Sequence, residues 1–149
     1  MSVRIAIVDD KIFLAKAVAE KLSFFEDFKL KFIAAHGADL LTKLDENSNI
    51  DLILMDIEMP VLNGIEATAL VKQKYPQIKI IMLTVFDNDE HIFNAIKAGA
   101  DGYLLKETSP DILEKGIRET LLFYASNVTI GTKDNKDGTM GSTDTITST

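Results

Sequence analysis

Five short apolar runs recur along the chain, and a stretch with helical spacing follows each of them. The runs are only a few residues long and rich in β-branched side chains, which is typical of buried strands. Strands that are apolar on both faces and alternate with helices form a parallel sheet with helices on both sides. The pattern predicts an α/β fold, a doubly wound five-stranded parallel sheet. Its strands are expected at residues 3–8, 29–34, 51–56, 78–84 and 102–106.

Start and stop signals mark the helices between these strands. Asp87 and Glu90 have the spacing of a capping box, and Gly99 is well placed to end the helix that they begin. Residues 109–111, Ser-Pro-Asp, combine an N-cap, a first-turn proline and an early acid. They predict a last helix that runs to about Tyr124.

Length and composition restrict the class of protein. A chain of 149 residues fits one domain with a sizeable core. The absence of cysteine rules out disulfides and thiolate chemistry, and the net charge of −7 argues against a broad basic face for nucleic acid. No apolar stretch approaches the ~20 residues that span a bilayer, and the first residues lack a secretory signal. We expect a cytoplasmic protein with no membrane contact.

The composition changes after Ala125. Residues 126–149 are rich in Thr, Ser, Gly and Asp and contain few large apolar side chains. Such a segment buries too little surface to offset its ordering entropy. We therefore expect a domain at residues 1–125 and a polar linker or tail at 126–149.

Polar residues follow the apolar runs of the predicted sheet. Ligands of open parallel sheets bind outside the carboxyl ends of the strands. Four of the five runs end in a polar or charged residue, and only the second ends in Ala35. The polar ends are Asp9-Asp10, Asp56, Thr84 and Lys106. Their convergence predicts a binding site at this edge.

The residue types suggest a chemistry for that site. Three carboxylates repel one another and stay ionised most easily around a cation, and hard oxygen ligands with room for water suit Mg²⁺. A lysine beside a metal site makes sense if a phosphoryl group arrives there, and Thr84 offers it a hydroxyl donor. Asp56 could then act as nucleophile and form an acyl phosphate. Each residue alone has an ordinary explanation, such as a helix cap for Asp9 or a solvated strand end for Lys106.

With these residues in place, the chain resembles the receiver domain of two-component response regulators, over roughly residues 3 to 124. Asp9-Asp10 resembles the acidic pair of that family. Residues 55–60, Met-Asp-Ile-Glu-Met-Pro, with Asn63-Gly64 resemble its phosphoacceptor loop. Thr84 matches the switch hydroxyl, Tyr103 the switch aromatic and Lys106 the active-site lysine. Such domains have a flavodoxin-like fold.

The resemblance implies that a sensor histidine kinase or a small phosphodonor phosphorylates Asp56 with Mg²⁺. It implies metal ligation by Asp10 and Asp56, with Asp9 acting through water and Glu58 through its backbone carbonyl. Phosphate would draw Thr84 inward and let Tyr103 turn in, which biases a bistable element. The same site would assist hydrolysis of the phosphoryl group, a modest enzymatic activity.

Residues 98–107 are similar to receivers of the LuxR (NarL/FixJ-like) type, which carry a helix-turn-helix domain. No such domain follows here, so we expect a natural protein that continues further and regulates transcription, with DNA bound only through that effector domain. A stand-alone receiver is the alternative. Residues 121–123, Leu-Leu-Phe, suggest a face for homodimers on phosphorylation, although such stripes commonly belong to a core.

Two positions depart from the family pattern. Glu107 stands where many receivers have a proline, often after a cis bond, and a non-proline cis bond costs ~3 kcal/mol. We therefore expect a trans bond. Val85 follows the switch threonine where a smaller residue is frequent, and its branched side chain is expected to slow phosphate turnover.

Three other classes of protein fit the sequence less well. A haloacid dehalogenase-type phosphohydrolase needs a second Asp two residues after its nucleophile, where this chain has Glu58. A flavin-binding flavodoxin-like module needs a Ser/Thr/Gly-rich phosphate loop, where this chain has Asp9-Asp10. A receiver that acts without phosphorylation is expected to lack Asp56 or Lys106, and both are present. His36 and His91 are expected to be ordinary surface or half-buried imidazoles.

Overall fold

A computed structural model of the chain describes residues 2–85 and 89–130. Within these ranges five strands alternate with five helices, and every strand lies within one residue of its predicted bounds. The elements in chain order are β1 (Val3–Val8), α1 (Ile12–Leu22), β2 (Phe28–Ala34), α2 (Gly37–Glu46), β3 (Leu52–Asp56), α3 (Gly64–Lys74), β4 (Lys79–Thr84), α4 (Asp89–Ala98), β5 (Gly102–Leu105) and α5 (Pro110–Ile130).

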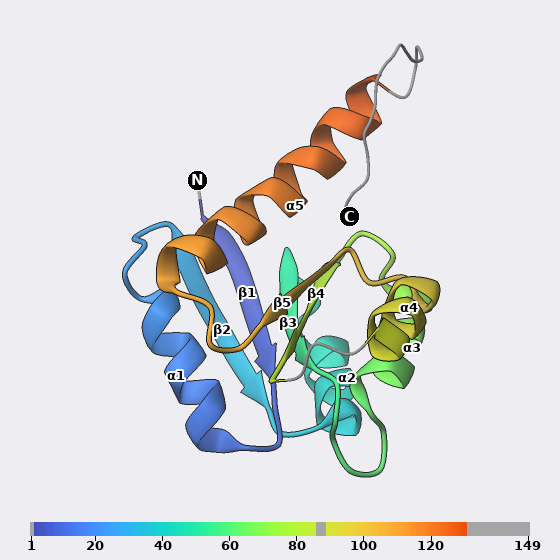
Figure 1. The fold of residues 1–149 in the computed structure, drawn as a ribbon. Helices are drawn as coiled ribbons and strands as arrows, with labels where there is room; N and C mark the ends of the chain where they lie inside the picture. Colours follow the sequence, from blue (N-terminus) through green and yellow to red (C-terminus); the bar gives the residue numbers. More distant parts are fainter. Residues whose placement is uncertain (1, 86–88, 131–149) are drawn as a thin grey trace.

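The strands form one parallel sheet in the order β2-β1-β3-β4-β5, which confirms the predicted doubly wound fold. Helices α1 and α5 cover one face, and α2, α3 and α4 cover the other (Figure 1). The strand order reverses between β1 and β3, because the chain passes from β1 to β2 on one side and then to β3 on the other. In doubly wound sheets the ligand crevice opens at this point.

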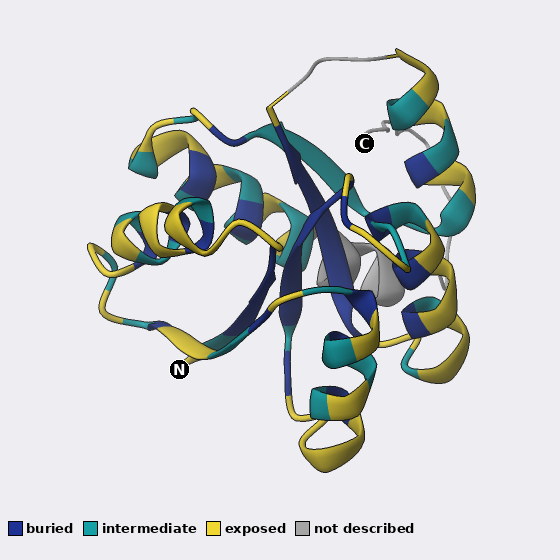
Figure 2. Ribbon diagram, turned by 90° about the horizontal axis from the view of Figure 1, so that it is seen from below, coloured by how far each residue is buried: buried dark blue, intermediate teal, exposed yellow. Residues whose placement is uncertain are grey.

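The core consists of two apolar layers, one on each face of the sheet. Alternate residues of each strand point to opposite faces, so neighbouring side chains of one strand belong to different layers. In β3, Ile53 and Met55 pack with α2 and α3, whereas Leu52 and Leu54 pack with α1 and α5. The central strands are buried throughout and the outer sides of the helices are exposed (Figure 2).

Several helix ends agree with the sequence, and others do not. Gly99 has φ of 110° after α4, and the Ser109 hydroxyl accepts a hydrogen bond from the Ile112 N–H at 3.3 Å, as predicted for both caps. A capping box occurs at Asn63 and Glu66, where sequence reasoning did not place one. The box expected from Asp87 falls outside the described residues.

Helix α5 is longer than predicted. It continues to Ile130, whereas the sequence suggested an end near Tyr124. No proline or glycine occurs between Gly116 and Gly131, so nothing in the intervening residues stops the helix. The predicted boundary after residue 125 therefore falls inside a continuous helix, and residues 131–149 lie outside the described part. Among the described residues, no helix is both long enough and apolar enough to cross a membrane.

Candidate functional site

The carboxyl ends of neighbouring strands bring the predicted site residues together. Val8 of β1 pairs with Met55 of β3, so Asp9 and Asp56 follow as neighbours across these two strands. Lys106 comes directly after β5, and Thr84 is the last residue of β4. Parallel pairing thus places side chains that are far apart in sequence at one edge of the sheet.

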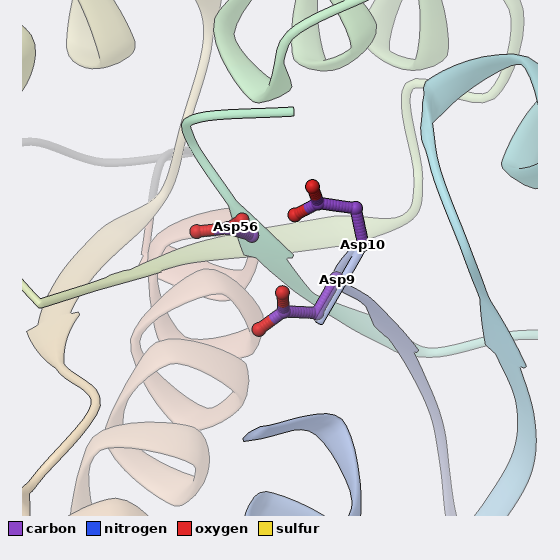
Figure 3. Close-up of side chains that lie close together, drawn as sticks. All are labelled: Asp9, Asp10 and Asp56. Atoms are coloured by element: carbon purple, nitrogen blue, oxygen red, sulfur yellow. The ribbon is translucent and has the colours of Figure 1, made fainter. Parts of the chain in front are cut away.

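Three aspartates form the centre of this site. Asp9, Asp10 and Asp56 each offer a carboxylate oxygen, and these atoms all lie within 4.8 Å of one another (Figure 3). Asp9 and Asp56 are buried, and Asp10 is exposed. No other described group of three or more His, Asp or Glu side chains is close enough to hold a metal ion. This cluster of three carboxylates is consistent with Mg²⁺ binding, and the predicted ligand role of each residue stays a prediction.

Two lysines partly balance the negative charge. The Lys106 ammonium lies 2.5 Å from Asp9 Oδ2 and 3.0 Å from Asp56 Oδ1, and its side chain is buried. The more exposed Lys11 lies 2.8 Å from Asp10 Oδ1 and 3.6 Å from Asp56 Oδ2. Sequence reasoning identified Lys106 and missed Lys11. The only signal for Lys11 was its position directly after the acidic pair.

The two oxygens of Asp56 have different surroundings. Oδ1 pairs with Lys106, whereas Oδ2 is buried and receives no hydrogen bond from the described residues. Burial raises the pKa of Asp56, the nearby Asp9 raises it further, and Lys106 opposes both. A raised pKa means that ionising this carboxyl costs stability above its ordinary titration range. An electrophile or cation at Oδ2 would relieve that cost, so the donor set fits a hard divalent ion.

Thr84, Tyr103 and Glu58 occupy positions around this centre. Thr84 is buried, and its carbonyl accepts a hydrogen bond from the Lys106 N–H at 2.8 Å. Tyr103 is half-buried and packs against the core layer under α2, α3 and α4. Glu58 is exposed, two residues beyond Asp56. Their switching and ligand roles stay predictions.

The two histidines are not part of the site. His36 is half-buried at the start of α2, where its Nδ1 accepts a hydrogen bond from the Asp39 N–H at 3.1 Å. His91 is half-buried in α4. Both are half-buried, as expected, and for His36 the structure adds a capping role.

The fold and the site together define a doubly wound α/β domain with an acidic, lysine-containing centre at its switch point. The family model of the response regulator receiver domain matches residues 5–118. The chain belongs to this family.

Relatives and solved structures support the same family. The chain is 38% identical over 120 residues to the response regulator protein VraR of Staphylococcus epidermidis, which covers 80% of this chain and 57% of that protein. A CheY-like receiver domain structure from Methanospirillum hungatei has a TM-score of 0.75 at 30% identity, over 85% of this chain and 99% of that one. A DNA-binding response regulator of the LuxR family from Staphylococcus aureus has a TM-score of 0.73 at 28% identity, over 80% of this chain and 98% of that one.

These similarities support the predicted LuxR-type receiver. The chain spans little more than half the length of the curated VraR relative that it matches. What the remainder of such a protein does is therefore a separate question from what these residues do.

Proposed function

We propose that this receiver domain accepts a phosphoryl group on Asp56 in a Mg²⁺-dependent reaction and thereby switches an output. One observation carries the proposal: Asp56 Oδ2 is a buried carboxylate oxygen without a hydrogen bond from the described residues, beside two further aspartates. Among the described residues its ion-pair partner is the Lys11 ammonium at 3.6 Å, so a phosphorus atom could bond to this oxygen without breaking a hydrogen bond.

The transfer would proceed by attack of Asp56 Oδ2 on the phosphorus of a phosphohistidine or a small acyl phosphate. The new bond joins that oxygen to phosphorus. The bond from phosphorus to the donor breaks, and its electron pair leaves with the imidazole or the carboxylate. Lys106 is paired with Asp56 Oδ1 at 3.0 Å, and from this position its ammonium would neutralise a phosphoryl oxygen.

Asp10 and Asp56 would hold the metal, with Asp9 through water and Glu58 through its carbonyl. Bound there, Mg²⁺ would neutralise charge that develops on the phosphoryl oxygens. The chain's own contribution is to bury the nucleophile, to orient it at the end of β3 and to keep Lys106 beside it. Water would later attack the acyl phosphate, which returns the carboxylate and releases phosphate.

The switch and its partners belong to the same proposal. Thr84 would donate its hydroxyl to the phosphoryl group, and Tyr103 would follow by turning inward. The donor in the cell would be a sensor histidine kinase in the cytoplasm, and the output would be transcription. DNA would be bound by an effector domain outside these residues, with residues 126–149, which begin within the last turns of α5, as linker or tail.

Homodimer formation on phosphorylation is the remaining part of the proposal. In α5, Leu121 packs against the core, whereas the Leu122 side chain is 67% exposed, so only part of the predicted face is available to a partner. Sedimentation with and without the phosphoryl group tests whether two chains associate.

The phosphorylation test uses intact mass after incubation with Mg²⁺ and a small acyl-phosphate donor. We expect the mass of one phosphoryl group in wild type and in Asp111→Asn, an exposed aspartate of α5, and none in Asp56→Ala or in excess chelator. Absence of the gain in wild type under every donor would leave a receiver that acts by phosphorylation-independent binding. A gain that persists in Asp56→Ala would assign the group to another residue.

A further inference from the structure

The turn after β5 fixes the position of the Lys106 backbone, from which the Lys106 side chain extends. The Lys106 N–H donates to the Thr84 carbonyl at 2.8 Å, and the Thr108 N–H donates to the Leu105 carbonyl at 3.2 Å. The second bond closes a turn around Lys106 and Glu107, and the first joins this turn to the end of β4. The structure has no cis peptide bond among its described residues, in agreement with the trans bond expected before Glu107. The turn is therefore held without the proline that many receivers carry.

A second lysine contacts this turn from another element. The Lys21 ammonium, in the last turn of α1, donates to the carbonyls of Lys106 and Thr108, each at 2.7 Å. The segment between β5 and α5 runs beside α1 in Figure 1, which allows this reach. Both bonds are charge-assisted and short, the stronger kind of hydrogen bond. Together they bind the backbone on both sides of Glu107.

A lysine in the last turn of a helix can hydrogen-bond the carbonyls of its own helix end. Lys21 instead bonds to a segment more than 80 residues away in sequence. Lys21 is half-buried, so its ammonium loses part of its hydration. The hydrogen bonds to the two carbonyls compensate for the lost bonds to water. Lys16 of the same helix is exposed and has no hydrogen bond or ion pair within the described part of the chain.

We propose that Lys21 is a positioning residue for phosphoryl transfer, holding the backbone of Lys106 so that the Lys106 ammonium stays between Asp9 and Asp56. The inference rests on the proposed phosphorylation of Asp56. The path has two steps: Lys21 fixes the Lys106 carbonyl, and the Lys106 side chain reaches the two carboxylates at 2.5 and 3.0 Å. A misplacement of about 1 Å can reduce a rate by about 100-fold, so a loose turn is expected to slow transfer.

The test compares three variants by the rate of phosphoryl gain from an acyl-phosphate donor at saturating Mg²⁺. Lys21→Met keeps an unbranched side chain only one atom shorter and removes the donors, and we expect a rate about 5- to 20-fold lower. Lys21→Arg keeps the charge and several donors, and we expect a rate within about twofold of wild type. Lys16→Met, the matched control, should leave the rate unchanged.

Melting temperatures are measured first, and every rate is taken well below them, so that a loss of folded protein does not enter the comparison. A purely structural role would lower the melting temperature of Lys21→Met and leave its rate equal to that of Lys16→Met, which would overturn the proposal. Equal slowing of Lys21→Met and Lys21→Arg would also overturn it, because the arginine restores the donors.

Failure of the proposed function gives a different result. If wild type gains no phosphoryl group, both proposals fall together. If wild type gains it and Lys21→Met does so equally fast, only the positioning role falls. Hydrogen exchange of the Thr108 amide adds a readout that needs no phosphoryl group. The expected result is faster exchange in Lys21→Met than in Lys16→Met, and equal exchange would contradict the proposal.

Discussion

Replacing Gly64 by alanine should distort the backbone of Asp56, the proposed phosphoacceptor. Gly64 begins α3, and an ideal Cβ built on it would lie 1.9 Å from the carbonyl oxygen of Asp56 and 2.8 Å from its carbonyl carbon. An ordinary contact begins near 3.4 Å, so the two segments must separate by about 1.5 Å. The Gly64 N–H also donates to the Ile57 carbonyl at 2.8 Å, which ties the helix start to this loop.

The cost follows from what the new methyl group meets. Its three nearest neighbours are backbone atoms of Asp56 and Ile57, so no side-chain rotation can make room. Overpacking of this kind costs typically about 1–3 kcal/mol, and we expect about 3 kcal/mol here. For a domain of this size that corresponds to a fall in melting temperature of roughly 10 °C. Because the displaced carbonyl belongs to Asp56, phosphoryl gain should also be slower in the protein that remains folded.

Gly102→Ala is the matched control. There the new Cβ would meet side-chain atoms of Ile81 and Thr120 at 3.3 and 3.4 Å, which can move by a few tenths of an ångström. Thermal unfolding followed by circular dichroism, with urea titration for the free energy, compares both variants with wild type. The reasoning is refuted if Gly64→Ala melts within about 3 °C of Gly102→Ala. Such a result would mean that the backbone at Asp56 and Ile57 moves aside without lowering the free energy of unfolding.

Three further results are expected. Lys11→Gln removes a positive charge 3.6 Å from Asp56 Oδ2, so Mg²⁺ should bind about fivefold more tightly by calorimetry, and weaker binding would contradict this. Burial lowers the pKa of Lys79 to about 8 in the folded protein. Above that pH the unfolded chain therefore binds more protons at this residue than the folded protein does. The free energy of unfolding, measured by urea titration, should therefore rise by about 1 kcal/mol per pH unit from pH 8 to 10. This rise should vanish in Lys79→Met. Val85→Ala should dephosphorylate faster than wild type. Equal dephosphorylation rates would show that the branched side chain of Val85 does not slow phosphate turnover.

The fold was predictable because its signal is strong and repeated. Each strand is a continuous apolar run with a sharp polar end, and burial on both faces leaves one architecture for such runs. The centre of the site was predictable for the same reason, since parallel strands carry their last residues to one edge. Asp9, Asp56 and Lys106 meet there, as expected from the strand ends alone.

The features that were missed depend on three-dimensional contacts that leave little trace in sequence. Lys21 and Lys11 are single lysines in a helix and a loop, and only the position of their partners gives them a role. The capping box at Asn63 is an exception, because Asn63 and Glu66 already have the spacing of such a box in the sequence. The end of α5 was placed too early because composition changes before the helical backbone does.

The contact between Asp9 and Lys106 joins residues 97 positions apart, close to the first and last elements of the sheet. Closing so long a loop is entropically costly, so this pairing forms late on any folding route that begins with local contacts. Until β5 docks, Asp9, Asp10 and Asp56 repel one another without Lys106 beside them, so the arrival of Lys106 relieves this repulsion and favours completion of the sheet edge. A ribosome-bound or partly folded chain that lacks β5 would thus have no lysine beside Asp56, the proposed phosphoacceptor. On that proposal, phosphorylation is confined to molecules in which β5 has docked.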